Sequence, residues 1–250
     1  VHDQADMAVR TEDFLQAARE LDSRLSGIEN GPLLFIEYAA GIKPATFAAF
    51  FNSIRNLSRV SACIDVGHVG IFQVRRAYSR THPKDDVCAL KAAGDRLSLA
   101  LPEVQAAVDA ALPEVLKLID VIGRLGKPLH FHLHDGHPLS RFSPFGVSDH
   151  LSFFEEIPLD APVRGRRSLP TMFGPAGLSG IVSAAMNTPS AEDISFTLEI
   201  HPRFERLPLG DAEKLFAHWR DKTNAEQMNH WLDVLRRNHT LLRNSLPPAH

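Results

Sequence analysis

The sequence predicts an α/β protein built on a parallel sheet of the β/α-barrel type. Short apolar segments of strand length alternate with longer amphipathic segments along the 250 residues, which is the pattern of parallel strands joined by crossover helices. Because the carboxyl ends of parallel strands meet at one edge, side chains placed there converge. Four predicted strands end in a side chain that binds metals: Leu33–Glu37, Ser61–Asp65, Leu129–His132 and Ser195–Glu199.

Apolar residues at helical spacing predict the helices between these strands. Thr11 is an N-cap followed by two acidic residues, and its helix extends to Leu25. Pro44 opens a second helix, over 45–57. A long helix is expected from Pro102 to Leu125, ended by a Gly-Lys-Pro sequence. Later helices are expected over 178–186, 211–220 and 224–242, whereas 69–99 is predicted to be a loop with at most a short helix, and 134–167 to be irregular.

Four strands are fewer than the eight that close a barrel of this type. The chain begins with Val1 and His2 rather than with methionine, and these two residues resemble the end of another strand. We therefore expect the C-terminal half of a barrel, or a partial barrel that lacks its N-terminal strands. No linker, repeat or low-complexity tract divides the chain, which predicts a single domain over residues 1–250.

Composition narrows the classes of partner. A formal net charge of −3 and a pI near 6.5 favour neither nucleic acid nor an anionic membrane, and no apolar run approaches the roughly 18 residues that span a bilayer. Two cysteines are too few for a disulfide framework, so we expect reduced thiols and a cytoplasmic location. A small molecule is the expected partner, and self-association is left open.

Polar and apolar residues alternate at the predicted strand ends. His130, His132 and His134 are separated by apolar residues, so the three imidazoles share one face of the strand. Taken singly, Glu37 is explained as a surface group, Asp65 as a helix cap and His132 as a core histidine. Taken together, buried carboxylates and imidazoles are costly unless they are paired or bind a cation. The set therefore favours a shared divalent-metal site.

Several of these segments resemble one family. Cys63–His68 (CIDVGH) resembles the C-[IL]-D-x-x-H strand end of the xylose isomerase-like TIM-barrel superfamily, which includes sugar isomerases, sugar epimerases and endonuclease IV. Phe131–Asp135 (FHLHD) resembles its H-[LV]-x-D strand end, Leu198-Glu199 its final L-E, and Phe35–Tyr38 (FIEY) its I-E-[NY]. The motifs occur in the family's order over nearly the whole chain, from His2 to Leu242.

The resemblance implies a metal quartet of Glu37, Asp65, His132 and Glu199. It also implies that the two glutamates act as acid and base on a sugar, and that His68 contacts the substrate. His2 and His150 are candidate additional ligands or substrate contacts. Three carboxylates and one imidazole suit Mn²⁺, Mg²⁺ or Co²⁺.

We therefore expect an enzyme of carbohydrate metabolism: a divalent-metal-dependent sugar or polyol isomerase or epimerase that transfers a proton through an enediolate. A hydride shift with two metals is left open. One alternative is an endonuclease IV-like phosphodiesterase that cuts abasic DNA with Zn²⁺ and uses His2, His68 and His150 as extra ligands, although Ser148 replaces an aspartate ligand of that family. The other alternative is an inactive partial barrel with exposed sheet edges.

Overall fold

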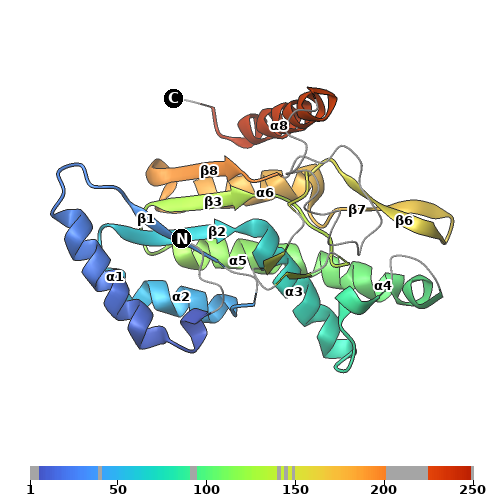
Figure 1. Ribbon diagram of the computed structural model, residues 1–250, viewed down its shortest axis with the longest axis horizontal. Coiled ribbons are helices and arrows are strands. Elements are labelled where there is room, and N and C mark those ends of the chain that lie inside the picture. The colour runs from blue at the N-terminus through green and yellow to red at the C-terminus, as the bar shows by residue number, and fades with distance from the viewer. Residues whose placement is uncertain are drawn as a thin grey trace.

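A parallel sheet forms the centre of the protein in the computed structural model (Figure 1). The structure describes residues 6–38, 41–90, 95–139, 142–143, 146–147, 150–200 and 225–248. Within them the four predicted strands are confirmed and lie in the order β1-β2-β3-β8, with every neighbouring pair parallel. The α/β class is therefore correct. The strands are β1 Leu34–Glu37, β2 Val60–Asp65, β3 Leu129–Leu133 and β8 Ile194–Leu198.

Helices follow or precede these strands in the alternation that the sequence predicts. α5 and α6 lie behind the sheet in the view of Figure 1, α1 and α2 beside β1 and β2, and α8 beyond β8. No described helix is long and apolar enough to cross a membrane. The α-helices are α1 Thr11–Ser26, α2 Pro44–Ser53, α3 Val66–Thr81, α4 Asp95–Asp109, α5 Ala111–Gly123, α6 Gly174–Met186 and α8 Ala225–Ser245, and the short 3₁₀ turns are η1 Asp6–Ala8, η2 Val87–Ala89 and η3 Ala191–Asp193.

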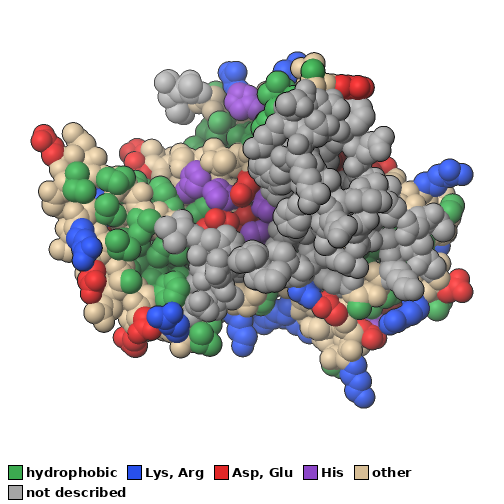
Figure 2. Space-filling view, in the orientation of Figure 1, with side chains coloured by type: hydrophobic (Ala, Val, Ile, Leu, Met, Phe, Trp, Pro, Cys, Tyr) green, Lys and Arg blue, Asp and Glu red, His purple; other side chains and the backbone are tan. Residues whose placement is uncertain are grey.

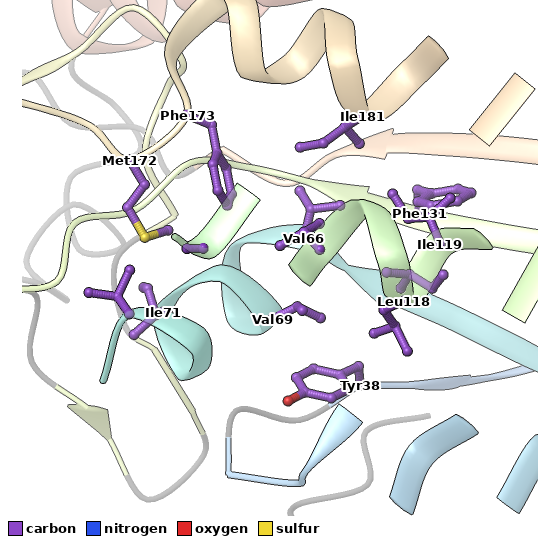
Figure 3. Packing of buried hydrophobic residues seen from close by; sticks show 14 of the residues in the cluster. Tyr38, Val66, Val69, Ile71, Leu118, Ile119, Phe131, Met172, Phe173 and Ile181 are labelled. Carbon is purple, nitrogen blue, oxygen red and sulfur yellow. The ribbon is translucent and has the colours of Figure 1, made fainter. Parts of the chain in front are cut away.

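The loop predicted over 69–99 is wrong in its first part, because α3 continues directly from the end of β2. Two glycines and several β-branched residues lower the helix propensity of this segment. The glycines serve packing instead: a side-chain carbon at Gly70 would lie 2.3 Å from the ring of Phe173. Buried residues on this helix, including Val66, Val69 and Ile71, join the main hydrophobic cluster (Figure 3).

The long helix predicted from Pro102 is also wrong, because two helices occupy this region. α4 begins at Asp95 and carries Pro102 inside it, and α5 begins afresh at Ala111. Pro113 has no N–H to bond to the carbonyl of residue 109, and it lies in the first turn of α5, where that N–H is not needed. A new helix that begins at Ala111 therefore accommodates Pro113 better than one continuous helix would. The helix expected over 211–220 lies outside the described residues.

The stretch 134–167, predicted to be irregular, contains two antiparallel hairpins. β4 (Phe142–Ser143) pairs with β5 (Gly146–Val147), and β6 (Glu156–Val163) pairs with β7 (Arg166–Pro170). The turn of the second hairpin has φ +49° at Arg164 and +79° at Gly165, as the two-residue turn that matches strand twist requires. The hairpin residues have little alternation of their own, which is why the sequence did not reveal them.

The two faces of the central sheet differ in character. Apolar side chains such as Ile64, Phe131 and Leu133 point to the helices and are fully buried. Figure 3 shows Phe131 in one cluster with Ile119 of α5, and each such side chain stabilises the fold by about 1.5–3 kcal/mol. The opposite face carries the polar set. Figure 2 shows histidine and acidic side chains gathered on it, over the strand ends.

Candidate metal centre

The strand register arranges the polar side chains in successive rungs across the sheet. Paired residues on neighbouring parallel strands project to the same face. Glu199 continues the pattern beyond β8, because its N–H donates to the carbonyl of Leu133 at 3.1 Å. The first rung is Glu37–Cys63–His130–Ser195, and the second is Asp65–His132–Thr197.

Four of these side chains form the predicted quartet. One ligand atom from each of Glu37, Asp65, His132 and Glu199 lies within 4.8 Å of all the others. Nδ1 of His132 is 2.9 Å from Oε2 of Glu199 and 3.4 Å from Oε1 of Glu37. The two glutamates therefore both approach one imidazole, and Asp65 is its partner on the neighbouring strand.

His132 occupies the position in which a cation would balance the carboxylates. Although its Nδ1 is close to Oε2 of Glu199, the two atoms are not aligned as a hydrogen bond, and both are buried without a hydrogen-bond partner among the described residues. Burial lowers the pKa of His132, but its polar contacts with Cys63, Glu199 and Glu37 outweigh burial and raise the pKa to about 12. A proton on this ring thus supplies positive charge that a divalent ion can replace.

Asp65 is held by a second, fully buried contact. Both of its carboxylate oxygens lie within reach of Nε2 of His134, at 2.9 and 3.1 Å, and both residues are 0% exposed. Because Nδ1 of His134 faces the carbonyl of Asp135 at 2.9 Å, both ring nitrogens face acceptors and both must carry a proton. Burial lowers the pKa of His134, but the charge of Asp65 outweighs burial and raises the pKa to about 9.

The same carboxylate caps a helix. Oδ1 of Asp65 accepts the N–H of His68 at 2.7 Å, at the N-terminus of α3. Burial raises the pKa of Asp65, but the charge of His134 outweighs it and holds the pKa well below its usual range. Asp65 is therefore a helix cap, as its position alone suggested, and also a member of the quartet. These roles are compatible because a carboxylate accepts several contacts at once.

The structure places the other predicted site residues around this centre. His68 is 2% exposed, and its Nδ1 lies 3.5 Å from Oδ2 of Asp65. Burial lowers the pKa of His68, which favours the neutral ring. His150 lies with Nε2 3.8 Å from Glu199 and with its ring 4.1 Å from that of His134. His2 lies outside the described residues.

A second group of ligands therefore adjoins the quartet. Ligand atoms of Asp65, His68, His134 and His150 also lie within 4.8 Å of one another. Both ring nitrogens of His134 already face acceptors, Asp65 at 2.9 Å and the carbonyl of Asp135 at 2.9 Å. Imidazolium at His134 thus supplies the positive charge of this group in the described structure.

Cys63 is also part of the site, although its sequence context alone did not indicate a ligand. Its side chain is 2% exposed and belongs to a third group with His130 and His132, again within 4.8 Å. The ring of His130 is held by two hydroxyl groups, that of Ser195 at 2.7 Å and that of Thr197 at 3.2 Å. The alternation that revealed the histidines also includes Cys63, two residues before Asp65.

Asp135 anchors the loop that follows β3. Its carboxylate accepts N–H groups of Gly136, Phe173 and Gly174 at 2.7–3.2 Å. Its backbone N–H and carbonyl also bond to Leu151, at 2.8 and 3.0 Å. Burial raises the pKa of Asp135 to about 6. This residue connects the end of β3 to the start of α6 and so fixes the segment that carries His134.

Comparisons with protein-family models, with curated proteins and with solved structures found no match for this chain. The chemistry of the centre therefore rests on its own residues. Carboxylates and imidazole in this proportion can hold a hard or intermediate divalent cation. The two glutamates are also suitable groups for accepting and returning protons near that cation.

Proposed function

We propose that the protein is a divalent-metal-dependent isomerase or epimerase of sugars or polyols, on a sheet that belongs to a xylose isomerase-like β/α barrel. The observation that carries the proposal is the pair of glutamates, Glu37 and Glu199, brought to one imidazole from β1 and from the end of β8. Helices on one face of the sheet and ligands at the strand ends on the other also support a barrel.

The residues of the centre have two roles in this proposal, which are metal binding and proton transfer. Glu37, Asp65, His132 and Glu199 would hold Mn²⁺, Mg²⁺ or Co²⁺. When bound, the cation supplies Lewis-acid stabilisation of an enediolate. One glutamate removes the proton beside the substrate carbonyl, and the other returns a proton. Such transfer typically contributes about 10²–10⁴-fold to the rate.

The experiment combines metal analysis with isotope exchange. Purified protein should contain stoichiometric Mn²⁺, Mg²⁺ or Co²⁺, and His132→Ala should lose most of it. In deuterated buffer with Mn²⁺, a ketose or an inosose-type keto-polyol from a panel should gain deuterium at the carbon beside its carbonyl. Glu37→Gln and Glu199→Gln should each abolish this exchange, whereas Glu20→Gln, on the exposed side of α1, should not. Unchanged metal content in His132→Ala, or no exchange with any member of the panel, would overturn the proposal.

A second candidate is the zinc phosphodiesterase of the same superfamily. It is favoured by the group around Asp65, which brings His68 and His150 together as the extra ligands that this activity requires. We place it second because both ring nitrogens of His134 already face acceptors, Asp65 and the carbonyl of Asp135, whereas Nδ1 of His132 has no hydrogen-bond partner among the described residues. Zinc-dependent nicking of a duplex with one abasic site, lost in His150→Ala, would favour the phosphodiesterase over the isomerase or epimerase.

A further inference from the structure

Cys63 lies at the centre of the ligand-bearing face. It pairs in register with Glu37 on one side and with His130 on the other. Its sulfur, a nitrogen of His130 and a nitrogen of His132 lie within 4.8 Å of one another. The proposed quartet offers three carboxylates, whereas this group offers one thiol and two imidazoles. The two groups therefore prefer different ions, since thiolate selects soft cations and carboxylate selects hard ones.

We propose that Cys63, His130 and His132 form a second metal site, specific for a thiophilic divalent cation such as Cd²⁺ or Zn²⁺, and that this site excludes the metal of the quartet because both use His132. Three protein ligands and a water complete the tetrahedral coordination that these ions accept. On binding, the thiol releases its proton to solvent and the sulfur forms the bond to the cation.

Hydroxyl groups beside His130 support this assignment. Nδ1 of His130 contacts the hydroxyl of Ser195 at 2.7 Å, and Nε2 contacts that of Thr197 at 3.2 Å. A metal-binding histidine usually keeps a hydrogen bond on its second ring nitrogen, which orients the ring. One nitrogen of His130 can therefore bind the cation while the other keeps its hydroxyl. His130 and His132 are half-buried on the polar face, which gives a cation a route to the sulfur.

Cadmium titration tests the site directly. The chain has two cysteines, so Cys88→Ser leaves Cys63 as its only thiol. In that background Cd²⁺ should produce the ultraviolet charge-transfer absorption of a cadmium–thiolate bond, with saturation. Cys63→Ser and Cys63→Ala should both abolish it, and circular dichroism checks that each variant is folded. His130→Gln should weaken binding by more than the ~10–100-fold typical of losing an outer hydrogen-bond partner, whereas Ser195→Ala should weaken it less.

Competition between Cd²⁺ and Mn²⁺ tests whether the Cys63 site and the quartet exclude each other. Cd²⁺ should release protein-bound Mn²⁺, and the electron paramagnetic resonance signal of Mn²⁺ measures this release. Cys63→Ser should require at least about tenfold more Cd²⁺ for the same release. This competition rests on the proposed quartet, whereas the thiolate absorption does not. If Mn²⁺ fails to bind while the absorption appears, the quartet is wrong and the Cys63 site stands. Absence of the absorption, unchanged half-saturation in His130→Gln, or simultaneous binding of both ions would overturn the inference.

Discussion

The ring of His134 occupies the space that the missing side chain of Gly67 leaves. A side-chain carbon built at Gly67 would lie 2.0 Å from Cε1 of His134 and 2.4 Å from its Nδ1. No real carbon approaches a buried ring so closely, and the ring is held by Asp65 on one side and by the carbonyl of Asp135 on the other. The glycine in the sequence Asp65-Val66-Gly67-His68 therefore allows the contact that buries the Asp65 carboxylate.

Gly67→Ala should therefore destabilise the protein and weaken its metal binding together. We expect a loss of about 1–3 kcal/mol from overpacking, because the ring must leave Asp65. Gly180→Ala is the matched control: it also lies in a helix, and its added carbon would meet nothing within 4 Å, so it should stabilise by about 0.5–1 kcal/mol. Urea unfolding and metal titration measure both variants. Equal stability of the two proteins would contradict this account of Gly67.

His134→Gln should change how stability depends on pH in the metal-free protein. The pKa of His134 is raised from 6.5 to about 9, so its stabilising effect is complete below pH 6.5 and is lost as the pH rises toward 9. Asp65, whose pKa is lowered, keeps its contribution throughout this window. Glutamine donates an N–H but does not titrate. The free energy of unfolding of His134→Gln should be lower than that of wild type at pH 6, and this difference should shrink by roughly 2–3 kcal/mol between pH 6 and 9.

Denaturant unfolding of chelator-treated protein at several pH values measures that difference. Wild type should lose stability more steeply than His134→Gln across the window. His130→Gln serves as the control, because burial lowers the pKa of His130, so titration of this ring cannot make wild type lose stability as the pH rises. Parallel curves for wild type and His134→Gln would show that His134 is not protonated in the folded state.

Metal binding at the quartet should release a proton at neutral pH. The metal-free pKa of His132 is about 12, so the ring carries a proton that the cation must displace. Apparent affinity for Mn²⁺ should therefore rise about tenfold per pH unit between pH 6.5 and 8.5. Calorimetry in buffers of different ionisation enthalpy counts the protons. An affinity that does not vary with pH would place the cation away from His132.

Asp135→Ala should destabilise the fold by about 2–4 kcal/mol. The change leaves the N–H groups of Gly136, Phe173 and Gly174 without the carboxylate that accepts them, and buried donors without an acceptor cost about 1–3 kcal/mol each before relaxation. Asp135→Asn keeps one acceptor oxygen and should cost less than half as much. Urea unfolding gives both values. A larger loss for asparagine than for alanine would assign the effect to something other than these hydrogen bonds.

Local pattern was enough to locate the strands and their polar ends. Residues two apart share a strand face whatever surrounds them, so the alternation around His132 and the acidic strand ends predicted both the sheet and the grouping of Glu37, Asp65 and Glu199. The same reasoning failed for α3, because Gly67 and Gly70 lower helix propensity in isolation. Their benefit comes from His134 and Phe173, which arrive from distant parts of the chain.

The sequence by itself thus determined the α/β class, the four strands and the candidate ligands, since hydrophobic period and strand direction are local properties. Only the tertiary structure decided the partners: that His134 pairs with Asp65, that Cys63 joins His130 and His132, and that hairpins follow β3. These contacts depend on strand register and on space between elements, which arise when segments far apart in the chain pack against one another.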